Sequence, residues 1–174
     1  MRRLLLLRHA KAAPGLEADD FHRELTDSGQ DDARLMGKFI VKRRLVPDLV
    51  VHSGARRTKE TAELVAAKFP HKVEALENND LYDATRMLIL DVLRALPDAA
   101  HSVLVVGHNP GTADVANLLA GEGAREPRLR MASKFPTAAL AVLESKIPSW
   151  ADIAPKVARL QHFVTPADLE GRDD

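Results

Sequence analysis

The chain has 174 residues, and its 25 lysines and arginines balance 25 aspartates and glutamates, so the formal net charge is zero. Without a broad basic field, we expect it to bind neither nucleic acid nor an anionic membrane. The absence of cysteine excludes disulfides and a thiolate nucleophile, and it fits a reducing compartment. The length predicts a single domain over residues 1–174, with no run near the roughly 18 apolar residues that a membrane span needs. We therefore expect a cytoplasmic protein.

The first half of the chain alternates short apolar runs with helical patterns, which is typical of a mainly parallel sheet. In order, it predicts a strand at 4–7, a helix that reaches residue 41 and is capped by Thr26 or Asp27, a strand at 49–51, a helix at 62–69 that Pro70 stops, and a strand near Val73. The start of the chain imitates a signal peptide, but the apolar run ends at Arg8 and no small-residue cleavage site follows. We interpret this run as a strand.

The second half continues the alternation. It predicts a buried helix at 87–96 that ends before Pro97, a strand at 103–106, a helix at 109–119, and late strands at 138–143 and 158–163. We expect the two late strands to pair antiparallel at an edge of the sheet. Glycines, a proline and many charges at 121–135 indicate a mobile loop, and residues 165–174 are expected to fray. The whole pattern predicts a three-layer α/β/α sandwich.

Two of the predicted strands end in histidines. Arg8 and His9 directly follow the leucine run, and His108 follows the run at 103–106 after a single glycine. In open α/β sheets the ligand crevice lies beyond the carboxyl ends of the strands, so we expect both histidines at one site. Each motif alone is also compatible with a structural role, such as a polar strand end or a strand-to-helix turn. Only their combination favours a catalytic site.

These residue types suit phosphoryl transfer. A neutral imidazole can attack phosphorus and hold the phosphoryl group, provided that a hydrogen bond fixes the proton on its other nitrogen. His9 is placed for this role, and arginines bind phosphate oxygens through two parallel hydrogen bonds. Arg8 is adjacent, and Arg57 follows the strand at 49–51 near a helix start, whose N–H groups favour anions. His108, protonated by the dianion it meets, would add a further charge.

The ordered set of motifs resembles the histidine phosphatase (phosphoglycerate mutase-like) superfamily, and more closely its small SixA-like phosphohistidine phosphatase branch. The motifs are Arg8-His9-Ala10, the Ser-x-x-x-Arg-x-x-x-Thr-Ala run from Ser53 to Ala62, and Gly107-His108-Asn109-Pro110-Gly111, supported by Arg23-x-Leu25-Thr26-x-x-Gly29, Leu81-Tyr82 and Phe135-Pro136-Thr137. The resemblance implies a phosphoglycerate mutase-like fold and a metal-independent reaction without a cofactor. His9 would be the phosphorylated nucleophile, Arg8 and Arg57 the phosphate clamp, and His108 the second pocket histidine. Asn109 is a further candidate for phosphate binding.

Several positions depart from the pattern of the family. Ala10 replaces a usual glycine, and Gly54 replaces a usual proline, which is expected to loosen the loop that carries Arg57. His22-Arg23-Glu24-Leu25 replaces Asp-Arg-Pro-Leu, so an acid sometimes expected there is absent. Larger relatives use a glutamate as proton donor, and Asp80 is the nearest positional match for this general acid. Asn78-Asn79-Asp80 is also ordinary turn composition, and the competing carboxyl groups are Asp19, Asp20 and Asp83.

The sequence thus predicts a phosphatase that works through a phosphohistidine on His9, which water then hydrolyses. No long insertion after the second or third strand could build a lid, so we expect a pocket open to a macromolecular phosphate, such as phosphohistidine on a partner protein. A small-molecule phosphomonoesterase and a non-catalytic phosphate-binding module remain alternatives, whereas a mutase lacks an identifiable substrate-carboxylate site. The partner and the oligomeric state stay open. The remaining histidines show no ligand spacing, so no metal site is expected; they are His22, His52, His71, His101 and His162.

Overall fold

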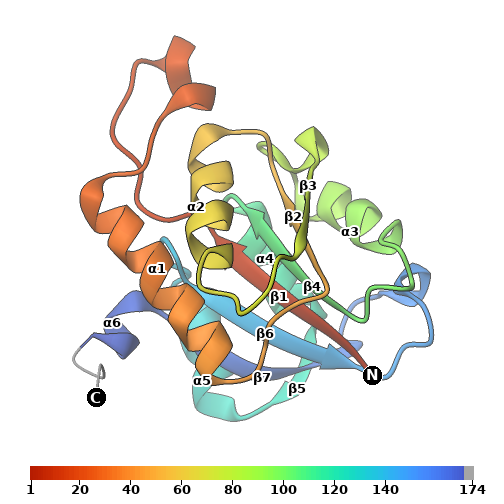
Figure 1. Cartoon of the computed structure of the whole chain (residues 1–174). Coiled ribbons are helices and arrows are strands. Elements are labelled where there is room, and N and C mark those ends of the chain that lie inside the picture. The colour runs from red at the N-terminus through yellow and green to blue at the C-terminus, as the bar shows by residue number, and fades with distance from the viewer. Residues whose placement is uncertain (171–174) are drawn as a thin grey trace.

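The computed structural model describes residues 1–170 as a mixed sheet between two layers of helices (Figure 1). Its strands are β1 (Arg2–Arg8), β2 (Leu49–His52), β3 (Glu74–Glu77), β4 (Ser102–Gly107), β5 (Ala120–Gly123), β6 (Leu140–Ser145) and β7 (Ala158–Val164). Its α-helices are α1 (Asp27–Lys42), α2 (Arg56–Ala66), α3 (Arg86–Arg94), α4 (Gly111–Leu119), α5 (Arg125–Ser133) and α6 (Pro166–Leu169). Three short 3-10 helices are η1 (Glu17–His22), η2 (Asn79–Leu81) and η3 (Trp150–Asp152). None of the described helices is long and apolar enough to cross a bilayer.

The sheet has the strand order β3-β2-β4-β1-β6-β7-β5, with β1 at its centre. β1 runs parallel to β4, where Leu7 lies opposite Val106, and antiparallel to β6, where Leu7 lies opposite Leu140. Arg8 lies opposite Gly107 at the end of the parallel ladder. The residues that follow β1 and β4 therefore emerge side by side at one edge of the sheet, as expected for neighbouring parallel strands.

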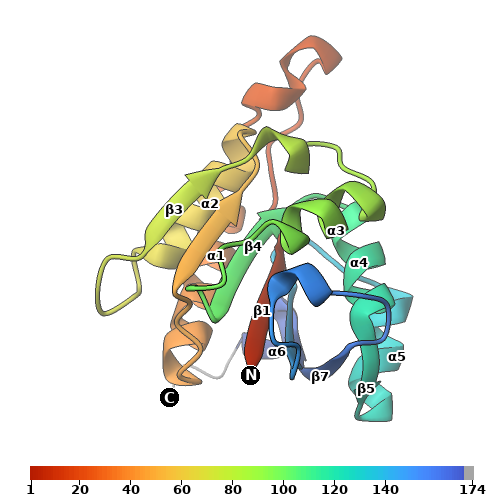
Figure 2. The same cartoon turned by 90° about the vertical axis from the view of Figure 1, so that its right-hand side faces the viewer.

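The leucine run of β1 explains the two layers, because alternate side chains of a strand point to opposite faces. Leu5 and Leu7 pack in the hydrophobic cluster beneath α1, α2 and α6, whereas Leu4 and Leu6 pack in the cluster beneath α3, α4 and α5. Figure 2 shows α1 and α2 on one side of the sheet and α3, α4 and α5 on the other. All four leucines are at most 3% exposed, and each contributes about 1.5–3 kcal/mol by leaving water. The predicted three-layer α/β/α sandwich is confirmed.

The position of the antiparallel strand differs from the prediction. β6 pairs antiparallel with β7, as expected, but it lies inside the sheet, and the edge strands are β3 and β5. β6 also begins two residues after the predicted boundary, because Ala138 adopts the left-handed conformation (φ 59°) and belongs to a turn. A residue with that φ cannot continue an extended strand. The backbone N–H of Ala138 instead donates to the carbonyls of Arg8 and His9.

Three other expectations need correction. The segment 121–135 is not a loop, since it forms most of β5 and all of α5; Met131 anchors the helix in the core at 2% exposure, and Arg130 bonds Asp168. Residues 165–169 of the expected frayed tail form α6 with a capping box at Thr165, whereas residues 171–174 lie outside the described residues. Helix α3 is not buried all round, because Met87 and Leu88 face solvent.

Candidate active site

A pocket of about 370 Å³ lies beyond the carboxyl ends of β1 and β4. Its lining contains both predicted histidines and three arginines; the full set is Arg8, His9, Lys11, Ala12, Asp20, Arg23, Arg57, Tyr82, Asp83, His108, Asn109 and Thr137. A larger hollow of about 730 Å³ shares only Thr137 with it and contains neither histidine. The smaller pocket is therefore where the predicted chemistry would take place, although it is not the largest hollow of the described chain.

His9 is held as a neutral imidazole with a defined tautomer. Its Nδ1 lies 2.7 Å from the carbonyl oxygen of Ala10. A carbonyl can only accept, so Nδ1 carries the hydrogen and Nε2 carries the free electron pair. Burial, together with the nearby charges of Arg57, Arg8 and Arg23, lowers the pKa of His9 to about 4 despite the opposing effect of the bond to Ala10. At neutral pH, Nε2 is thus available as a nucleophile.

The two predicted clamp arginines both reach the pocket. Arg8 donates from Nη1 to the carbonyl of Phe135 at 3.1 Å, and burial lowers its pKa. Arg57, at 7% exposure, donates to the backbone oxygen and to the carboxylate of Asp20, at 2.7 and 3.2 Å. The Nε–H groups of both arginines are buried without a partner among the described residues. Buried donors without an acceptor are costly, and it is the Nη groups of these arginines that are placed to bind an anion in two parallel hydrogen bonds.

His108 lies beside His9, with ring centroids 5.3 Å apart. Its Nε2 is 2.7 Å from the hydroxyl of Ser53, and its Nδ1 is 3.3 Å from Nη2 of Arg57. Burial, first, and the charges of Arg57 and Arg8 lower the pKa of His108 to about 3 against the opposite effect of Asp20, and any proton on the adjacent His9 would lower it in the same direction. His108 is therefore neutral here, and it would need an added negative charge nearby to hold a second proton.

Asn109 lines the pocket, but its side chain is engaged by the protein. Its Nδ2 donates to the carbonyl of Phe135 at 2.8 Å, and its Oδ1 accepts from the backbone of Ala113 at 3.3 Å. The same Phe135 carbonyl accepts from Arg8. Asn109 therefore helps to place the acceptor that orients Arg8, and direct contact with phosphate stays a prediction.

The structure does not bring Asp80 into the pocket. Its side chain is exposed in η2, and its backbone N–H donates to the Asn78 side chain at 2.9 Å, which is the turn structure that competed with a catalytic role. Asp20 and Asp83 line the pocket instead. The structure therefore does not place Asp80 in the pocket, and its role as a general acid stays a prediction.

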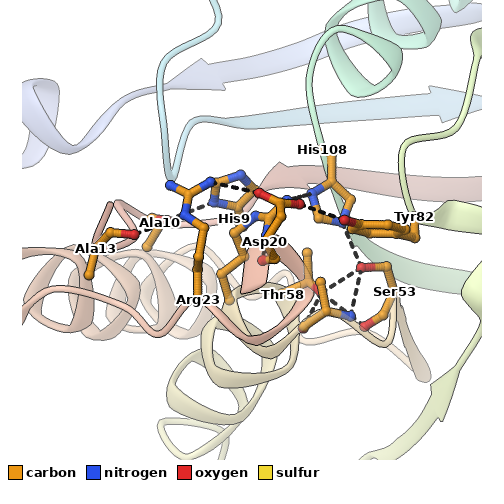
Figure 3. A network of polar contacts seen from close by, with 11 residues as sticks. His9, Ala10, Ala13, Asp20, Arg23, Ser53, Thr58, Tyr82 and His108 are labelled. Atoms are coloured by element: carbon orange, nitrogen blue, oxygen red, sulfur yellow. Dashed lines mark hydrogen bonds and ion pairs between the residues drawn. The ribbon is translucent and has the colours of Figure 1, made fainter. Parts of the chain in front are cut away.

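Asp20 is the centre of a network that sequence reasoning missed (Figure 3). Its carboxylate accepts from Tyr82 at 2.5 Å, from Arg23 at 3.0 Å and from Arg57. The Tyr82 bond, followed by those of the two arginines, outweighs burial and lowers the pKa of Asp20 to about 2. An ionised carboxylate cannot donate a proton, so Asp20 serves as an anchor for Arg57. Two features of the sequence pointed to this network: the Leu81-Tyr82 motif, and Asp20 as one of the carboxyl groups that competed with Asp80.

Gly54, which was expected to loosen the loop that carries Arg57, takes part in a hydrogen bond that holds this loop. Its backbone N–H donates to Oδ1 of Asn79 at 3.1 Å. A Cβ at this position would lie only 2.1 Å from that oxygen, and a proline would also lack the N–H. A second tie comes from Thr61, whose hydroxyl accepts from Ala10 N at 3.0 Å and donates to Arg57 O at 2.7 Å. The first bond joins the loop after β2 to η2, and the Thr61 bonds join the loop after β1 to the first turn of α2.

Comparison with known proteins agrees with this geometry. The sequence model of the family described as "Histidine phosphatase superfamily (branch 1)" matches residues 4–83. An uncharacterised protein of Mycobacterium tuberculosis is 30% identical over 162 residues, which are 92% of this chain and 99% of that protein. Two solved structures are candidate phosphohistidine phosphatases SixA: that from Nakamurella multipartitia has a TM-score of 0.83 and 28% identity, covering 95% and 96% of the two chains. That from Agrobacterium tumefaciens has a TM-score of 0.79 and 29% identity, covering 95% and 98%.

The fold and the pocket of arginines and histidines define an α/β enzyme of the phosphatase class. The chain belongs to the histidine phosphatase superfamily, and the resemblance predicted from the order of its motifs is confirmed.

Proposed function

We propose that the protein is a metal-independent phosphatase that transfers a phosphoryl group to Nε2 of His9 and then to water. The observation that carries this proposal is the bond from His9 Nδ1 to Ala10 O, which leaves the Nε2 electron pair free in a pocket with two clamp arginines. The lowered pKa of His9 supports it, because a protonated imidazole has no electron pair for attack.

The reaction would take two steps. In the first, the Nε2 electron pair forms a bond to phosphorus while the bond to the leaving group breaks and that group takes its electron pair. In the second, water attacks phosphorus, the N–P bond breaks, inorganic phosphate is released and neutral His9 is restored. Arg8 and Arg57 would bind the phosphoryl oxygens in both steps, since guanidinium groups stabilise the charge on the transferred group.

We propose phosphohistidine on a partner protein as the substrate. The links after β2 and β3 are short, so neither provides an insertion long enough to cover the pocket. The solved structures described as SixA support the same substrate class. The chemistry is compatible with it as well: of the carboxyl groups considered as the acid, Asp80 lies outside the pocket and Asp20 is held ionised, which leaves only Asp83 among the described pocket residues. A phosphohistidine releases an imidazole, which needs less help from an acid than an alkoxide does.

Two measurements test this proposal. The enzyme is mixed with a phosphohistidine-containing protein, quenched in alkali and digested, and the peptide that contains His9 is analysed for acid-labile phosphate, which we expect to find there. A panel of phosphohistidine proteins and small phosphate esters is then compared by kcat/KM. Higher values for the esters would favour a small-molecule phosphomonoesterase. Phosphate binding without turnover of any substrate would leave the non-catalytic binding module.

A further inference from the structure

We infer that Ser53 and Thr58 are positioning residues that fix the tautomer of His108, with the hydrogen on Nε2 and the free electron pair on Nδ1. The consequence for catalysis rests on the proposed function, but the tautomer itself does not. Figure 3 shows the arrangement: the hydroxyl of Ser53 lies between the His108 ring and Thr58. Ser53 and Thr58 are completely buried, so no water competes for these bonds.

Thr58 sets the direction of these hydrogen bonds, because its hydroxyl has a single hydrogen. Thr58 Oγ1 lies 2.8 Å from the carbonyl of Ala55 and 2.9 Å from the carbonyl of Ser53. Neither carbonyl can donate, so both contacts are favourable only if the Thr58 hydrogen points toward them. With its hydrogen used there, Thr58 can offer only an electron pair to other partners.

The direction in which the Ser53 hydroxyl donates follows from this. It lies 2.6 Å from Thr58 Oγ1, and since that oxygen accepts, Ser53 must be the donor. The remaining electron pairs of Ser53 accept from the backbone N–H of Ala55 at 3.4 Å and from His108 Nε2 at 2.7 Å. Nε2 of His108 therefore carries the hydrogen.

The contact of Nδ1, on the opposite side of the ring, independently indicates the same tautomer. Nδ1 of His108 lies 3.3 Å from Nη2 of Arg57. A guanidinium is always protonated and can only donate, so Nδ1 must present its electron pair. The reverse tautomer would place two N–H groups against each other here.

This arrangement prepares His108 for a phosphoryl group. Nε2 is tied to a buried hydroxyl, so Nδ1 is the ring nitrogen left for the pocket. When an anion binds, Nδ1 can take up a proton and donate to it, provided that Nη2 of Arg57 turns from Nδ1 toward the anion. The bond from Nε2 to Ser53 stays unchanged, so this side of the ring is already in the orientation that electrostatic stabilisation needs.

The test is a long-range ¹H–¹⁵N correlation spectrum of the full chain labelled with ¹⁵N-histidine, recorded at neutral pH with and without sulfate. We expect the His108 Nε2–H tautomer in the free protein and a proton on both nitrogens with sulfate bound. In Thr58→Val, the Ser53 hydroxyl is free to donate to Nε2, so the tautomer should change to Nδ1–H or become mixed. Thr58→Ser keeps the hydroxyl and should restore the wild-type spectrum.

Activity provides the second readout. We expect kcat of Thr58→Val to fall about tenfold with little change in KM, and Thr58→Ser to recover it. Ser53→Ala, which removes the acceptor itself, is the companion variant if Thr58→Val does not fold. An Nδ1–H tautomer in the wild type, or an unchanged spectrum in a folded Thr58→Val or Ser53→Ala, would overturn the inference. Because the spectra need no substrate, a failure to find phosphate on His9 would overturn the proposed function and leave the tautomer assignment standing.

Discussion

The imidazole rings of His9 and His108 lie against one another at one wall of the pocket, with centroids 5.3 Å apart and planes inclined at 57°. His9 is bound at Nδ1 to the Ala10 carbonyl, whereas His108 is bound at Nε2 to the Ser53 hydroxyl and at Nδ1 to Arg57. Two protonated imidazoles at this distance, beside two arginines, would repel strongly. The lowered pKa values of both rings agree with this, and both are neutral at pH 7.

The first prediction concerns the nucleophile. His9→Ala should lower kcat by at least about 10³-fold, because covalent catalysis loses its attacking atom. The fold should be retained, since His9 follows the end of β1 rather than contributing to the hydrophobic clusters. Circular dichroism and steady-state kinetics check both points, with the exposed His71→Ala as the matched control. Substantial turnover by a folded His9→Ala protein would exclude the proposed mechanism.

The second prediction concerns metal dependence. Activity should survive incubation with EDTA, because charge neutralisation is assigned to Arg8, Arg57 and His108. The measurement is kcat/KM before and after chelation and dialysis. If chelation abolished activity and a divalent cation restored it, the assignment of the arginines as the phosphate clamp would be wrong.

The third prediction separates Asp20 from Asp80. Asp20→Asn should lower kcat/KM about tenfold, because it weakens the charge-assisted bonds that hold Arg57 and Arg23. Asp80→Asn is the matched control and should stay within about twofold of wild type for alkyl phosphates, aryl phosphates and phosphohistidine alike. A selective loss on alkyl phosphates in Asp80→Asn would reinstate Asp80 as a proton donor.

The fourth prediction is a dependence of stability on pH. Both histidines have a folded pKa below the usual 6.5, about 4 for His9 and about 3 for His108. Below about pH 6.5 these two histidines are therefore protonated in the unfolded chain but remain neutral in the folded protein. The free energy of unfolding should fall as the pH drops toward 4, by at most about 1.4 kcal/mol per pH unit for each histidine. Urea unfolding measures the slope, which should be shallower in His108→Asn and unchanged in His71→Asn.

The fifth prediction concerns the binding of anions. Sulfate carries no proton of its own between pH 5 and 8, so any pH dependence of its binding comes from the protein. If the bound anion raises the pKa of His108, sulfate affinity should increase as the pH falls, by up to about tenfold per unit. Isothermal titration calorimetry in two buffers measures the protons taken up. A pH-independent affinity in the wild type, or a dependence that persists fully in His108→Asn, would contradict this assignment.

Much of the fold could be predicted because the central strands of the sheet coincide with strong local patterns, namely runs of apolar residues. The leucines before Arg8 and the valines before Gly107 are buried on both faces, so apolar runs identify β1 and β4. Polar residues at their ends then had to meet in space. The interior position of β6 could not be predicted, since the order of strands depends on long-range pairing rather than on any segment's own composition.

The missed parts have weak or non-local signals. In α5 only Met131 is buried, so no helical apolar stripe marks it, and tertiary contacts such as Arg130 with Asp168 support it instead. The Asp20 network joins η1 to a tyrosine 62 positions later in the sequence, and Ser53 contacts a histidine 55 positions later. Contacts between residues so far apart in the sequence leave no spacing pattern from which they could be predicted.

The central position of β1 also determines when the site can form during folding. β1 is completed at Arg8, yet one of its two partners begins at Ser102 and the other at Leu140. Contacts between such distant segments cost loop-closure entropy and tend to form slowly. His9, the proposed nucleophile, therefore directly follows the first strand to be synthesised, which is one of the last to be enclosed. A nascent chain that ends before β6 would leave one side of β1 unpaired, so activity should appear only once nearly the whole chain has been made.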